Sequence, residues 1–128
     1  MIHIFDGAMG TMFQQLGLLR PGACPEMLCV DHPEQVTKVH QRYVDAGSTI
    51  IESFTFGASA LKLEHYGLSD QVVEINQAAV KAAKAVKVPE GGCVKIAGGM
   101  GPSGRFIKPL GDLDFEEASA NYYLPPHA

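Results

Sequence analysis

The stretch DAGSTIIESFTFGA, residues 45–58, is the part of this sequence that indicates its fold most clearly. Residues 49–54 within it are rich in β-branched and aromatic side chains, which pack well in β-sheets. Gly47 precedes this run and Gly57 follows it, so the run is bounded as a strand between two loops would be. The stretch therefore predicts a short strand that leads into a glycine-bearing loop.

A predicted helix lies on each side of this strand. Before it, Asp31 and Glu34 have the spacing of a capping box, and Gly47 stands where a C-terminal cap is expected. After it, Ser69 is expected to cap a long helix that ends before Pro89. The apolar stripes of the two helices are Val36, Val39, Tyr43 and Val44 in the first, and Val72, Ile75, Ala79, Ala82 and Val86 in the second.

Two further strands are predicted, at residues 2–5 and 93–97. The first is an apolar run that stops at Asp6, although one turn of buried helix would have the same pattern. The second opens into Gly98 and Gly99. Strand, helix, strand, helix and strand in turn predict an α/β fold, in which parallel neighbours are joined by right-handed βαβ units.

The remaining segments are less regular. Residues 17–31 contain two prolines and two glycines, so an irregular loop is expected there. Asp114 and Glu117 repeat the capping-box spacing before a last, short helix. We expect one domain over residues 1–118 and an irregular tail over residues 119–128, which has the character of a truncated or frame-shifted end.

The carboxyl ends of the strands are where α/β proteins place their ligand sites. There, Asp6 is suited to hold a ligand ammonium or a metal-bound group, or merely to hydrogen-bond its own turn. Glu52 is a charge within a strand, so it either faces a polar site or pairs with a cation. Thr55 can donate a hydroxyl hydrogen bond, but threonine is also a common strand residue.

Composition excludes several classes of function. The 128 residues are 46% hydrophobic and carry a net charge of −4, which argues against a disordered chain and against nucleic-acid binding. No apolar run approaches the length that spans a bilayer, and no secretory signal is visible. Three cysteines, an odd number, do not make a disulfide framework, so a reducing cytoplasm is the expected location.

The cysteines and histidines show no zinc-site pattern. Cys24 and Cys29 lack a partner pair, and Cys93 is distant from both, so we interpret these residues as small buried hydrophobes or idle thiols. Three histidines are expected on helical or loop surfaces: His32, His40 and His65.

A glycine motif follows the third strand. Residues 99–104 match G-x-G-x-x-G, but Pro102 has no amide hydrogen, and Pro109 and Gly111 interrupt the helix that should follow. We therefore reject a dinucleotide site. A small-molecule α/β domain that binds a phosphate at this loop remains an alternative.

Five segments occur in the order and spacing of a known family: 6–12 (DGAMGTM), 24–26 (CPE), 45–58, 98–104 (GGMGPSG) and 109–111 (PLG). Together they resemble the N-terminal part of the homocysteine S-methyltransferase domain, above all that of cobalamin-dependent methionine synthase. Betaine–homocysteine methyltransferase is a cousin, and Phe54 is closer to that branch. The resemblance covers the chain up to about Ala118.

The resemblance implies a (β/α)8 TIM barrel, of which this chain supplies the first three βα units. In the family, zinc binds homocysteine as the thiolate, which takes a methyl group from a donor such as methylcobalamin to give methionine. By carry-over, Asp6 and Thr55 lie near the amino-acid group of homocysteine, and Glu52, Gly98 and Gly99 line the same mouth. None of the three cysteines matches a zinc ligand of the family.

These implications lead to three expectations for the chain. Alone, it binds homocysteine at most, without zinc and without methyl transfer. It self-associates, or it needs a partner such as the rest of the barrel or a corrinoid protein. The alternative from another class is a non-catalytic fragment that assembles with a partner chain.

Overall fold

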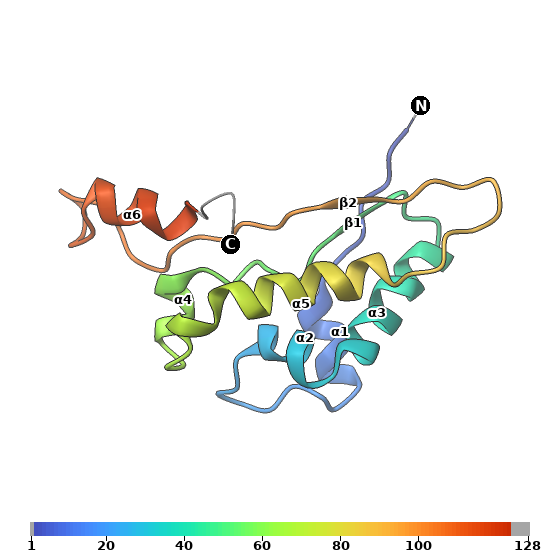
Figure 1. The fold of residues 1–128 in the computed structure, drawn as a ribbon, viewed down its shortest axis with the longest axis horizontal. Coiled ribbons are helices and arrows are strands. Elements are labelled where there is room, and N and C mark those ends of the chain that lie inside the picture. The colour runs from blue at the N-terminus through green and yellow to red at the C-terminus, as the bar shows by residue number, and fades with distance from the viewer. Residues whose placement is uncertain (1, 124–128) are drawn as a thin grey trace.

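The computed structural model describes residues 2–123 and shows a small parallel sheet with helices on one side of it (Figure 1). Strand β1 (Ile50–Glu52) pairs with β2 (Lys95–Ala97) in the register Ile50–Lys95 and Glu52–Ala97. On the other edge of β1, Phe5 forms a parallel bridge with Ile50. The predicted α/β fold and the parallel neighbours are therefore confirmed, with strands shorter than the sequence suggested.

A buried strand was predicted at residues 2–5, and the prediction of burial is wrong. Only the Phe5 bridge remains of that strand, and the side chains of Ile4 and Phe5 are 54% and 56% exposed. A parallel strand is buried only where both faces of its sheet are covered. The described helices cover one face, so this segment is paired through its backbone but open to solvent.

The two long predicted helices are present as α3 (Pro33–Asp45) and α5 (Val72–Lys84). They pack against each other below the strands in Figure 1, with Val36, Val39, Val44, Ile75, Ala79 and Ala82 among their buried residues. Gly47 follows α3 with φ of 107°, a value that favours glycine and ends the helix as predicted.

The N-terminal caps predicted for α3 and α5 are wrong. Helix α3 has His32 as its N-cap, without a side-chain cap bond, and starts with Pro33, whose fixed φ suits the first helical position. Asp31 instead ends the preceding helix α2 (Leu28–Asp31). Ser69 starts the 3₁₀ turn η2 (Ser69–Gln71) and does not cap α5.

Four short helical segments had no counterpart in the predicted pattern: α1 (Met9–Gln15), η1 (Pro25–Met27), α2 and α4 (Ala60–Glu64). The loop predicted at residues 17–31 is therefore irregular only as far as Cys24. Two of these segments end at glycines, since Gly17 and Gly67, with φ of 67° and 69°, close α1 and the turn after α4.

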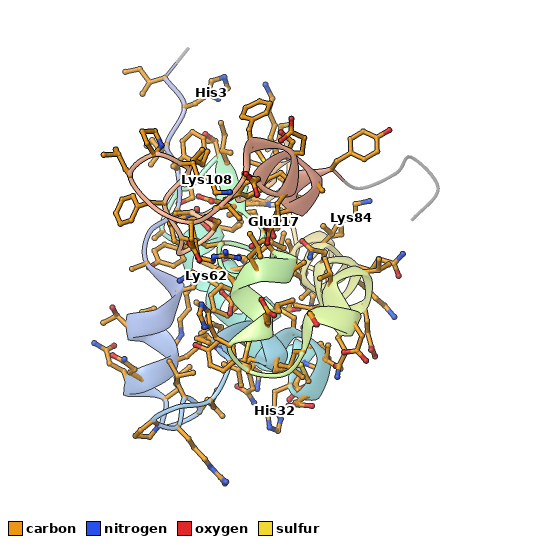
Figure 2. All side chains as sticks on the ribbon, turned by 90° about the vertical axis from the view of Figure 1, so that its left-hand side faces the viewer. His3, His32, Lys62, Lys84, Lys108 and Glu117 are labelled. Carbon is orange, nitrogen blue, oxygen red and sulfur yellow. The ribbon has the colours of Figure 1, made fainter. Side chains whose placement is uncertain are left out.

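Helix α6 (Phe115–Tyr122) corrects the expected tail, since it is helical through Tyr122; residues 124–128 lie outside the described part. Asp114 is its N-cap residue, as predicted, but its carboxylate accepts a bond from Lys108 Nζ at 2.8 Å and caps nothing. Glu117 pairs with Arg105 at 3.0 Å in place of closing a capping box. Lys108 and Glu117 are labelled in Figure 2.

The main core lies between the N-terminal helices and α5. Phe13 of α1 is fully buried, and its ring is 5.1 Å from that of Phe54, which lies two residues after the end of β1. Ile51 of β1 packs in a second cluster against Val44 and Ala83. These contacts fix the position of the carboxyl end of β1. Among the described helices, none is long and apolar enough to cross a membrane.

Candidate functional site

A cavity of about 430 Å³ lies at the carboxyl ends of the first two strands. Its walls are formed by residues 6–10, Pro25 and Glu26, residues 52–54, and Phe56. Three carboxylates line it, those of Asp6, Glu26 and Glu52. A larger hollow of about 620 Å³ lies among residues 17–32 and shares no lining residue with this cavity. The cavity at the strand ends is the candidate site, because two of the predicted residues, Asp6 and Glu52, line it.

Asp6 is held at the bottom of this site. Its side chain is 4% exposed, and both carboxylate oxygens accept the backbone N–H of Glu52 at 3.1 Å. The backbone N–H of Asp6 in turn donates to Ile50. Burial raises the pKa of Asp6, the Glu52 N–H bond opposes that rise, and the charge of Glu52 adds to it. A cation beside Asp6 would stabilise the charged carboxylate and so lower its pKa.

Glu52 faces the cavity and the loop after β2. Its side chain lies against Gly99, so closely that a Cβ atom at position 99 would overlap a carboxylate oxygen. No Lys, Arg or His of residues 2–123 lies within salt-bridge distance of it. Of the two interpretations that the sequence allowed, the structure supports a charge that faces a polar site.

Thr55 ties the ends of the two strands together. Its hydroxyl donates to the carbonyl of Gly99 at 2.8 Å and lies 2.9 Å from the hydroxyl of Ser53. The N–H of Gly99 reaches Ser53 Oγ at 3.4 Å. Thr55 and Gly99 are buried, whereas Gly98 is exposed. Four of the five predicted residues thus form one connected cluster, and Thr55 shapes the site from behind.

Glu26 is a site residue that the sequence analysis did not single out. It is 6% exposed; Oε1 accepts the N–H of Gly57 at 2.9 Å, and Oε2 accepts a weak bond from Cys24 Sγ. The only sequence signal was its place in the CPE segment. The fold brings it to the strand ends because η1, the turn that carries it, packs against α5.

His40 corrects another prediction. It was expected on a surface, but it is fully buried on the inner side of α3. The signal that identifies it is its spacing, since it lies four residues from both Val36 and Val44 on the apolar stripe. Its Nδ1 atom lies 3.9 Å from Oδ2 of Asp6.

The glycine loop after β2 is packed and closed. A Cβ atom at Gly101 would overlap the carbonyl oxygen and ring of Phe56, and the Gly101 carbonyl accepts the hydroxyl of Tyr122 at 2.8 Å. A phosphate cradle needs backbone amides that face open space. The arrangement favours a structural role for this loop over phosphate binding.

Substituting Gly101 should test that role. Gly101→Ala is expected to lower the free energy of unfolding by about 1–3 kcal/mol, because the added methyl group has no room beside Phe56. Gly98→Ala is the matched control, since a Cβ atom there meets no atom within 4 Å. Urea unfolding of both variants measures the difference. Equal stabilities would contradict the packed loop, and phosphate binding lost only in Gly101→Ala would support the phosphate alternative.

The described residues do not fit a zinc site. No three His, Cys, Asp or Glu side chains of residues 2–123 converge as metal ligands. Zinc takes cysteine as thiolate, but burial raises the pKa of Cys29 to about 12 and also raises that of Cys24. Cys93 is exposed, just before β2. Cys24 and Cys29 are free thiols of the core, and Cys93 is a free thiol at the surface.

Comparison of the sequence with known proteins identifies a family that it matches. The family model for homocysteine S-methyltransferase matches residues 3–125. Betaine–homocysteine S-methyltransferase 1 of Danio rerio is 32% identical over 108 residues, which cover 83% of this chain and 26% of that protein. Methionine synthase of Mycobacterium tuberculosis (strain ATCC 25618 / H37Rv) is 28% identical over 122 residues, which cover 89% of this chain and 10% of that protein.

A solved structure agrees with the sequence relatives. The homocysteine methyltransferase MmuM from Escherichia coli, in its oxidized form, matches with a TM-score of 0.65 and 27% identity. The match covers 80% of this chain and 38% of that one, so the chain spans well under half the length of these relatives. The resemblance predicted from the five segments is confirmed: the chain belongs to the homocysteine S-methyltransferase family.

Proposed function

We propose that this chain is the homocysteine-binding part of an S-methyltransferase and that the cavity at the strand ends receives the amino-acid group of homocysteine. The observation that carries this proposal is the wall of three carboxylates, Asp6, Glu26 and Glu52, without a cation of the described chain among them. Homocysteine brings an ammonium group, which is the charge that such a wall favours.

Asp6 is the proposed ammonium ligand. A carboxylate has about four lone-pair positions, and the Glu52 N–H occupies only part of them. The remaining positions can accept N–H bonds from the substrate. Thr55 and Gly99 hold the two loops at a fixed separation, so the site is shaped before the ligand arrives.

The thiol chemistry is assigned to residues outside the described part of this chain. The family's zinc would hold the substrate sulfur as thiolate, but the described residues offer no ligand cluster for it. We therefore propose that the chain alone binds homocysteine and transfers no methyl group. The same observation favours the second candidate, a non-catalytic component that acts only within an assembly.

A larger assembly follows from the open sheet. The three parallel neighbours, Phe5, β1 and β2, are proposed to be the first part of a (β/α)8 barrel whose further strands come from another polypeptide segment or from a second copy. A corrinoid protein carrying methylcobalamin is the proposed donor partner, by analogy with methionine synthase.

Calorimetric titration with L-homocysteine, in reducing buffer without added metal, tests the proposed function. Asp6→Asn keeps an oxygen for the Glu52 N–H but loses the charge, so affinity should fall by about 10- to 100-fold. Asp70→Asn, at an exposed position, is the control and should bind as the wild type does. The analogue 4-mercaptobutanoate, which lacks the ammonium group, should bind weakly to all three proteins. No homocysteine binding by the wild-type chain would refute the proposal.

A further inference from the structure

The environment of His40 is unusual for a core residue. The ring is fully buried, and neither nitrogen has a hydrogen-bond partner in the described part of the chain. A buried donor or acceptor left unpaired costs about 1–3 kcal/mol. An apolar residue at this position of the α3 stripe would avoid that cost, so packing alone does not account for a histidine.

The carboxylate of Asp6 lies within salt-bridge distance of the ring. The 3.9 Å between Nδ1 and Oδ2 is too long for a hydrogen bond. Shortening it by about 1 Å would give an ordinary bond. The two groups come from different elements, α3 and the segment before α1, and meet directly behind the candidate site.

We propose that His40 is a positioning residue for substrate binding: its Nδ1–H donates to Oδ2 of Asp6 and orients that carboxylate toward the ammonium group of homocysteine. This inference rests on the proposed function of the cavity. His40 itself does not line the cavity and does not touch the substrate.

A neutral imidazole suits this role. Burial lowers the pKa of His40 to about 4, so the ring is uncharged at neutral pH. An uncharged donor fixes the direction of the Asp6 carboxylate without cancelling the negative charge that the ammonium group needs. A lysine, or a protonated histidine, would compete with the substrate for that charge.

The tautomer of His40 gives the first test, on the wild-type chain without ligand. The proposal requires the proton on Nδ1, with Nε2 left as a lone pair, and nitrogen-15 NMR of the side chain distinguishes the two tautomers. A proton on Nε2 would overturn the proposal, because Nδ1 would then have nothing to donate. This measurement needs no variant and no bound homocysteine.

Two variants give the second test. His40→Asn places an amide N–H close to the position of Nδ1, whereas His40→Leu fills the space without a donor. Calorimetry should show homocysteine affinity about 10-fold weaker in His40→Leu and within about 3-fold of wild type in His40→Asn, as expected for one charge-assisted bond. Binding of 4-mercaptobutanoate should be the same in both, because that ligand has no ammonium group to meet Asp6.

The outcomes separate this inference from the proposed function. If the wild-type chain does not bind homocysteine, the proposed function fails, and the tautomer still reports whether His40 donates to Asp6. If the wild type binds and folded His40→Leu binds equally well, the positioning role fails while the proposed function stands. Equal weakening for homocysteine and its desamino analogue would also refute it, since only a general structural role affects both.

Discussion

The double variant Phe5→Lys/Ile96→Lys is expected to convert a self-associating chain into a monomer. Phe5 lies in register with Ile50 on the face of the sheet opposite to Ile51, which contacts the helices. Ile96 lies on the outer strand of the described sheet and is 36% exposed. Both sites are apolar surface next to unpaired strand edges, a combination that promotes association through the sheet.

The expected effect is large. Full burial of one isoleucine or phenylalanine side chain contributes about 1.5–3 kcal/mol. Phe5 and Ile96 are 56% and 36% exposed, so loss of both weakens association by about 10- to 100-fold. Sedimentation velocity over a range of concentrations measures the change. The control is Leu16→Lys/Val73→Lys, which removes two similarly exposed apolar side chains from α1's C-terminal cap and from α5. A wild-type chain that is monomeric at every concentration, or equal effects of both double variants, would contradict association through the strands.

The fold could be predicted from the sequence wherever a segment's own pattern determined its structure. The strand around Ile51 is β-branched and fully buried, so propensity and tertiary contacts agree. The stripes of α3 and α5 agree with their packing in the same way. Residues 2–5 have an equally apolar pattern, but their burial depends on surfaces that lie elsewhere, and no local pattern reports those surfaces.

Side-chain partners were less predictable than helices. Asp114 stands at the N-cap of α6, yet it bonds Lys108, and Glu117 bonds Arg105. A capping box is a local option that competes with longer-range ion pairs, and the loop before α6 supplies two cations at short distance. The sequence showed where the helix begins but not which partner its acidic residues would take.

Some residues of the candidate site could be predicted from the sequence in the same way, and others could not. Asp6, Glu52 and Gly99 could be predicted because each directly follows or ends a strand, where parallel topology gathers side chains. Glu26 and His40 could not, because their place in the site depends on how η1 and α3 pack beneath the sheet. The residues proposed to bind a ligand can thus be predicted from their positions at strand ends. The residues that support them can be identified only from the packing of the helices.

The free energy of unfolding is expected to fall by about 3 kcal/mol through His40 alone when the pH is lowered from 7 to 4. The pKa of His40 is about 4 in the folded chain, against about 6.5 for an exposed histidine in an unfolded chain. Between these values the unfolded chain binds the proton and the folded chain does not, so stability rises with pH and is lost as the pH falls from 6.5 toward 4. Above pH 7 both forms are neutral and the effect vanishes.

Asp6 acts in the opposite sense, which makes the assignment testable. Its pKa is raised in the folded chain, so the folded form takes up a proton more readily and gains relative stability as the pH falls toward its pKa. We therefore expect the free energy of unfolding, measured in urea between pH 4 and 7, to fall less steeply on acidification in His40→Leu than in the wild type. In Asp6→Asn it should fall more steeply. Because the other titrating groups are common to all three chains, their contributions cancel in the differences. If His40→Leu follows the wild-type pH dependence, the buried imidazole is not the group that acid charges, and the neutral donor assigned to Asp6 loses its basis.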